Sequence, residues 1–156
     1  MKRKIIRYSI LTVGLVIVIG GSYAAYLWFM PHRDVQAAPV DYNITTTELL
    51  KDYLESPEKA NNKYLQEEGD SKILAVTGTV AEITEDMEGN KVVLLREQGD
   101  DLGVMCYFLK ETSKNTSSLT IGKKTTIKGV IRSGAEYDED LDLYEDAVMQ
   151  DCDILK

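Results

Sequence analysis

The first long segment with a strand-like pattern of apolar side chains is Lys72–Ile83. β-Branched and small residues dominate this segment, proline is absent and Gly78 is its one glycine, a composition typical of a β-strand. Side chains on both faces are apolar or neutral, so we expect other elements to cover the strand for much of its length. Gly78 predicts a sharp bend or a close backbone approach in mid-strand. The odd step from Val80 to Ile83, the next large apolar residue, predicts a bulge.

Four later segments have shorter strand patterns. They are Lys91–Arg96, Leu102–Leu109, Lys124–Arg132 and Leu143–Leu155. In the last of them we expect one face to carry Val148, Cys152 and Ile154, and the other Met149, Asp151 and Asp153. Lys110–Leu119 has weak helical character and Ser133–Asp142 is an acidic loop. Five strands with a break between the third and fourth predict an all-β fold, the five-stranded, partly open Greek-key barrel called the OB-fold.

A short helical segment precedes the first strand. Thr45 and Glu48 have the spacing of a capping box at a helix N-terminus. Pro57 cannot continue that helix, but it fits as the first residue of a second one that runs to about Gln66. We expect these helices to pack on the barrel or to cover one of its ends.

The N-terminal part of the chain is apolar. Tyr8–Met30 has no charged residue across 23 positions, enough for a helix to span a hydrocarbon core of roughly 30 Å. The basic residues Lys2, Arg3, Lys4 and Arg7 precede it, whereas Arg33 and Asp34 after it cancel. The positive-inside rule then predicts a single-pass membrane helix with a cytoplasmic N-terminus and with residues 31–156 outside the cytoplasm.

A cleaved signal peptide is the alternative, because Val35–Ala37 before Ala38 is an acceptable small-residue cleavage site. The apolar run is much longer than the roughly 7–15 residues usual for a signal, which favours an uncleaved anchor. The predicted organisation is therefore a basic tip and transmembrane helix at 1–30, a linker at 31–43 and the OB-fold domain with its helical segment at 44–156.

Charge is unevenly distributed between these parts. The chain has 18 basic and 26 acidic residues, and four of the basic ones but none of the acidic ones lie in residues 1–30. Residues 31–156 therefore carry 14 basic and 26 acidic side chains, a net charge of −12. Nucleic-acid binding rests largely on neutralising phosphates, so this balance makes nucleic acid an unfavourable partner.

Catalytic patterns are not evident in the sequence. The one histidine, His32, lies in the predicted linker, which excludes histidine-dependent nucleophilic catalysis. There is no glycine-rich phosphate loop, and the many carboxylates on an acidic surface are expected to be solvated. We therefore expect a protein that is not an enzyme and that needs no cofactor.

The best metal candidates are Asp138, Asp140 and Asp142, whose alternation resembles the start of a calcium loop. The sixth position of that loop would be Leu143 instead of glycine, and the twelfth Met149 instead of glutamate. A solvated acidic loop is the favoured interpretation, with loose cation binding as the alternative.

Three tyrosines and two cysteines are the remaining candidates. OB-folds usually bind ligands through their second and third strands and the loops joining strands 1–2 and 4–5. Tyr107 in the third strand, Tyr137 in the loop between the fourth and fifth strands and Tyr144 at the start of the fifth strand could form a ligand face that stacks bases. Packing in a core or an interface is the more common role of tyrosine. Cys106 and Cys152 fall on the predicted inward face of the third and fifth strands, which are neighbours in an OB-fold, so they could form a disulfide.

Several segments, in order along residues 44–156, resemble the bacterial tRNA_anti-like family. They are Glu58–Tyr64, Val76–Val80, Val104–Phe108, Leu119–Gly129 and Val148–Ile154. The resemblance implies an OB-fold and an exported or membrane-attached location, and it brings no catalytic residue. The loop Ser133–Asp142 is longer and more acidic than the family pattern suggests.

Three hypotheses for function follow. The first is a non-catalytic interaction module held at the outer face of the cell membrane by one helix, with an envelope protein or another ligand as its partner. The second is binding of single-stranded nucleic acid, by analogy of fold alone. The third is a domain that binds a cation or small ligand through Ser133–Asp142.

Overall fold

The computed structural model describes residues 14, 16–26, 34–65, 71–138 and 142–155, and its contacts divide the chain into two units, Met1–Arg33 and Asp34–Lys156. In the first unit residues 16–26 are helical. Both ends of the predicted span Tyr8–Met30 lie outside the described residues. Within the described ranges, no helix is both long enough and apolar enough to cross a membrane.

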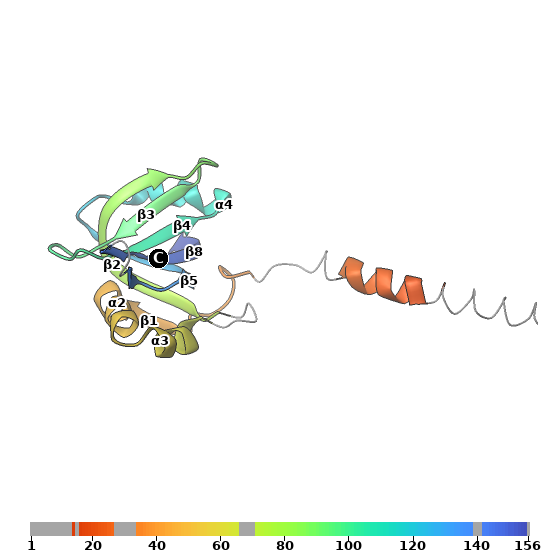
Figure 1. Ribbon diagram of the computed structural model, residues 1–156. Coiled ribbons are helices and arrows are strands. Elements are labelled where there is room, and N and C mark those ends of the chain that lie inside the picture. Colours follow the sequence, from red (N-terminus) through yellow and green to blue (C-terminus); the bar gives the residue numbers. More distant parts are fainter. Residues whose placement is uncertain (1–13, 15, 27–33, 66–70, 139–141, 156) are drawn as a thin grey trace, which may run out of the picture. The chain divides into compact units, whose positions relative to one another are not determined.

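The second unit is built on a closed five-stranded barrel (Figure 1). Its strands are β2 (Ile73–Glu85), β3 (Lys91–Leu95), β4 (Val104–Phe108), β5 (Lys124–Ser133) and β8 (Ala147–Ile154). They pair in the order β2-β3-β4-β8-β5, and β5 pairs back to β2. The β4–β8 pair is parallel and the other barrel pairs are antiparallel. This is the strand order of an OB-fold, as the sequence predicts.

Strand β2 joins the two halves of the barrel. Its first half pairs with β5 and its second half with β3, and the β3 register shifts between Val80 and Glu82, which confirms the predicted bulge. Gly78 lies at the change of partner. A Cβ atom there would be 2.5 Å from Cγ2 of Thr46 and 3.1 Å from Cβ of Leu95, so the close approach predicted at this glycine is to a helix and to β3.

Four short helical elements surround the barrel: α2 (Thr46–Glu55), α3 (Pro57–Tyr64), α4 (Lys110–Ser113) and the 3₁₀ helix η1 (Lys114–Ser118). Figure 1 shows α2 and α3 on the opposite side of the barrel from α4. The predicted capping box is present at α2: the Glu48 N–H donates to Oγ1 of Thr45 (3.2 Å), and the Thr45 N–H donates to the Glu48 carboxylate (3.0 Å). These bonds lower the pKa of Glu48. Leu49, Leu50 and Tyr53 of α2 are buried in the core.

The structure contains a strand that the sequence pattern does not predict. β1 (Tyr42–Thr45) pairs in parallel with β2, from Tyr42 opposite Leu74 to Thr45 opposite Thr77. The residues before it also pack on the barrel: Val35 is buried, and Nζ of Lys128 donates to the backbone carbonyls of Gln36 (2.8 Å) and Ala38 (2.5 Å). Residues 34–43, predicted as linker, are therefore part of the folded unit.

The C-terminal region differs from the prediction in two ways. The segment predicted as one strand, Leu143–Leu155, contains two, because β7 (Leu143–Glu145) pairs with β6 (Glu136–Asp138) in a separate two-stranded sheet. The predicted facing of β8 is also wrong at its start. Ala147, Met149 and Cys152 are the buried residues, and Val148 is half-buried.

An extra residue explains this facing. Lys128 and Val130 of β5 are two residues apart, whereas their partners Asp153 and Gln150 are three apart. Asp151, between those partners, has a φ of 53°, in the left-handed region. A bulge of this kind reverses the alternation of side chains along the strand.

Candidate functional site

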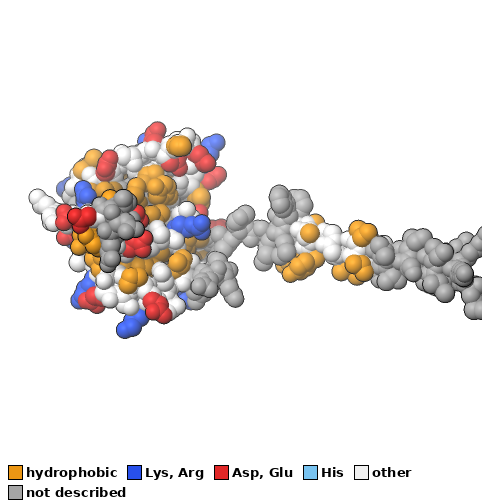
Figure 2. All heavy atoms as spheres, viewed as in Figure 1, with side chains coloured by type: hydrophobic (Ala, Val, Ile, Leu, Met, Phe, Trp, Pro, Cys, Tyr) orange, Lys and Arg blue, Asp and Glu red, His pale blue; other side chains and the backbone are white. Residues whose placement is uncertain are grey.

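The outer face of β3, β4 and β8 carries a row of half-buried apolar side chains. Val92 pairs with Tyr107 and Leu94 with Met105 across β3 and β4, and Met105 pairs with Val148 across β4 and β8. We call Leu94, Met105, Tyr107 and Val148 the apolar strip; all four are half-buried, while Val92 beside them is buried. Hydrophobic side chains gather over β3 and β4 in Figure 2. OB-folds use this face for binding, and Tyr107 thus lies where the sequence places it.

The hairpin formed by β6 and β7 brings the other two predicted tyrosines together. Tyr137 and Tyr144 are directly opposite, with ring centroids 4.8 Å apart, and 43% and 51% of their surfaces are exposed. The Tyr137 hydroxyl donates a hydrogen bond to the Asp142 carboxylate, which raises the pKa of Tyr137. The connection between β5 and β8 therefore contains two paired strands, β6 and β7, which carry adjacent tyrosines. The sequence predicts an acidic loop over most of this connection.

The predicted metal candidates are only partly described. Asp140 lies outside the described residues, Asp138 is the last residue of β6, and Asp142 has a φ of 51°. Among the residues whose placement is described, no group of three or more histidine, cysteine, aspartate or glutamate side chains could hold a metal ion.

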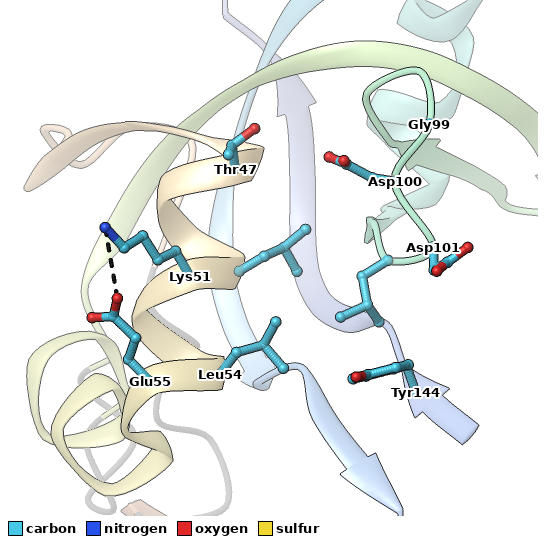
Figure 3. Close-up of a pocket in the computed structure, with 10 residues that line it drawn as sticks. Thr47, Lys51, Leu54, Glu55, Gly99, Asp100, Asp101 and Tyr144 are labelled. Carbon is cyan, nitrogen blue, oxygen red and sulfur yellow. Dashed lines mark ion pairs between the residues drawn. The ribbon is translucent and has the colours of Figure 1, made fainter. Parts of the chain in front are cut away.

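A groove lies between helix α2 and the loop that joins β3 to β4. Its volume is about 590 Å³. The lining residues, which we call the α2 groove, are Thr47, Leu50, Lys51, Leu54, Glu55, Gly99, Asp100, Asp101, Leu102 and Tyr144. Figure 3 shows Leu54 and Tyr144 pointing toward one another across it, and Lys51 and Glu55 on the side of α2 away from the loop. Of these residues only Tyr144 was predicted as a ligand contact.

The two cysteines are buried, free thiols in the structure. β4 and β8 are adjacent, but Cys106 is opposite Met149 and Cys152 is opposite Phe108, so the two cysteines are diagonal neighbours. Burial, and then the neighbouring Cys106, raises the pKa of the Cys152 thiol well above its ordinary value.

The Cys106–Cys152 disulfide stays a prediction for protein taken from an oxidising compartment, where such pairs form and persist. We expect denatured, unreduced protein from that compartment to show no reactive thiol, and reduced protein to show two. The measurement is thiol labelling read by mass spectrometry. Two labelled thiols per chain before reduction would contradict the bridge and leave the cysteines as small buried apolar residues.

The closed barrel and its strand order place the second unit in the class of OB-fold domains. The family model of the tRNA_anti-like proteins matches residues 1–139, so the chain belongs to the tRNA_anti-like family. No curated protein matches the chain. One similar solved structure is that of a Klebsiella pneumoniae subsp. pneumoniae protein described, provisionally, as a nucleic acid-binding lipoprotein. It is 20% identical, the alignment covers 76% of this chain and all of that one, and the TM-score is 0.54. A likeness at this identity supports the fold alone.

Proposed function

We propose that this protein is a non-catalytic binding module, an OB-fold barrel held at the outer face of the cell membrane by an uncleaved N-terminal helix. The apolar strip supports a binding role most directly. Leu94, Met105, Tyr107 and Val148 leave a continuous apolar surface in contact with water on the face that OB-folds use for ligands. An envelope protein is the partner we favour, because apolar and aromatic contacts dominate the centres of protein interfaces.

The membrane anchor is supported by the N-terminal unit. Val16, Ile17, Val18 and Ile19 are consecutive in its helix and each is 61–66% exposed. Four consecutive residues point to all sides of a helix, so this part is apolar all round, as expected of a helix surrounded by lipid. The family's expected exported or membrane-attached location and the lipoprotein description of the similar structure agree with an envelope location.

The topology can be tested with reporter fusions. We expect an enzyme that is active only outside the cytoplasm to work when fused after Lys156, and one that is active only inside to fail, because the basic cluster Lys2–Arg7 precedes the apolar run. The control reverses the charge bias by replacing the four basic residues with glutamine and adding four lysines after Met30. Activity of the cytoplasmic reporter on the unmodified chain would contradict the proposal.

Binding of single-stranded nucleic acid is the second candidate, and the description of the similar structure is the observation that favours it. The net charge of −12 on residues 31–156 opposes it, because phosphate neutralisation supplies most of the affinity. Fluorescence anisotropy with a labelled oligonucleotide decides between the two. Binding that weakens steeply with added salt, and that is lost in Tyr107→Ala, would favour nucleic acid.

A further inference from the structure

We propose that the α2 groove binds a peptide segment in which lysine or arginine residues flank a large apolar side chain. This inference rests on the proposed binding function and gives it a second site. The strip on the barrel face belongs to the strands, whereas this groove is formed by α2, which precedes the barrel, and by the β3–β4 loop.

The apolar side chains of the groove set the first requirement for its ligand. Leu50 and Leu102 of the lining are buried, while Leu54 and Tyr144 stay 47% and 51% exposed on opposite walls. The volume lies within the range of small ligand pockets. An apolar side chain placed between Leu54 and Tyr144 would remove both from water.

The charges around the groove set the second requirement. Neither carboxylate of Asp100 and Asp101 has a hydrogen bond or ion pair to any described residue. The one cation of the lining, Lys51, pairs with Glu55 at 3.6 Å, and both side chains are about two-thirds exposed. In Figure 3 the side chain of Asp100 points toward the Thr47 end of α2, whereas that of Asp101 points away from the helix, at the edge of the groove. The groove is therefore left with two unpaired negative charges, which complement a cationic peptide and repel phosphates.

The groove also has fixed walls. The Gly103 N–H, at the end of the loop, donates to the Asp146 carboxylate (2.7 Å), and the Asp100 N–H donates to the carbonyl of Glu97 (3.2 Å). Glu97 in turn accepts from Oγ1 of Thr79 in β2 (3.0 Å). On the opposite wall, the capping box fixes the start of α2. A ligand would therefore bind without first ordering the loop, which lowers the entropic cost of association.

A random library of twelve-residue peptides, displayed on phage and selected against the full-length protein in phosphatidylcholine nanodiscs, tests the inference. Empty nanodiscs serve for counter-selection. We expect enrichment of sequences with lysine or arginine on both sides of leucine, phenylalanine or tryptophan. The most enriched peptide is then labelled with fluorescein, and its affinity is measured by anisotropy.

The variants assign that affinity to the groove. We expect Asp100→Asn with Asp101→Asn to weaken binding about three- to tenfold, as for the loss of two exposed charge pairs, and to reduce its salt dependence. Leu54→Ser should weaken it by a similar factor with little change in salt dependence. The matched control is Glu82→Gln with Glu111→Gln, two exposed acids of β2 and α4, which should leave the affinity within twofold.

The opposite results overturn the inference. Enrichment of acidic peptides, no enrichment at all, or a basic peptide whose affinity is unchanged in the Asp100, Asp101 and Leu54 variants would each exclude the groove as its site. If binding is lost only in Tyr107→Ala, the groove inference fails while the proposed binding function stands. Tight, salt-sensitive binding of a labelled oligonucleotide that the groove variants abolish would replace the peptide with nucleic acid.

Discussion

Gly78→Val is expected to lower the free energy of unfolding of the barrel by about 1–3 kcal/mol, the range for overpacking a well-packed core. A Cβ atom at this position would lie 2.5 Å from Cγ2 of Thr46, and the branched methyl groups of valine would extend further. Thr46 is 1% exposed and begins α2, so it has little space into which to move. Denaturant unfolding of the full-length protein in detergent, followed by circular dichroism, measures the effect.

Two further comparisons separate this clash from a general intolerance of the strand. Glu82→Val places the same side chain at an exposed position of β2 and should change the stability by no more than about 0.5 kcal/mol. Gly78→Ala should cost less in a Thr46→Ala background than alone, because Cγ2 of Thr46, the nearest atom to the new Cβ, is then absent. Equal costs in both backgrounds would mean that α2 does not limit this position.

The barrel strands could be predicted because their segments are rich in β-branched and apolar residues, and β4 also alternates buried and half-buried side chains. β1 could not be predicted in this way, because Tyr42, Asn43 and Thr45 are exposed and Ile44 is half-buried, so the segment has no buried face. The packing of residues 34–38 could not be predicted either, because it depends on Lys128. This lysine is buried, and its ammonium group donates hydrogen bonds to the backbone carbonyls of Gln36 and Ala38. A lysine in a strand pattern normally indicates a solvent-facing position.

The facing of β8 shows a second limit of the pattern. Strict alternation would put Val148 and Cys152 on the same, buried face of the strand. The bulge at Asp151, which has a left-handed backbone conformation, changes the facing, so that Met149 is buried together with Cys152. Aspartate is enriched among the few non-glycine residues that adopt this conformation, but the strand contains both Asp151 and Asp153, so the sequence does not mark the position of the bulge.

The candidate sites divide along similar lines. The positions of Tyr107 on β4 and of Tyr137 beside Tyr144 follow from the strand pattern and the OB-fold topology, while their role as ligand contacts stays a prediction. The α2 groove was not, since Leu54 reads as the edge of a helical stripe and Asp100 as part of a turn. Their proximity depends on how α2 packs against the barrel, which residue spacing does not reveal.

The last prediction concerns Gly134, at the start of the hairpin connection. A Cβ atom there would lie 2.0 Å from two ring carbons of Tyr53 and 2.8 Å from a third, so the aromatic ring lies directly against the glycine backbone. Tyr53 is 1% exposed, a burial that also raises the pKa of its hydroxyl to about 12. Its ring contacts Tyr64 at a centroid distance of 6.2 Å, so it has little freedom to shift. Because the ring cannot move away from the new Cβ atom, Gly134→Ala should reduce the free energy of unfolding by about 2–3 kcal/mol.

A double-mutant cycle measured by denaturant unfolding tests this contact. Ser133→Ala, at the adjacent exposed position, should be nearly neutral. Tyr53→Ala alone should cost about 3–5 kcal/mol, the range for deleting a buried aromatic ring, but Gly134→Ala should add almost nothing in that background because the clashing ring is gone. The expected coupling energy is therefore close to the full cost of Gly134→Ala. An additive cycle would show that the cost of Gly134→Ala comes from the backbone conformation at this position. The contact with the Tyr53 ring of α2 would then not explain the need for glycine.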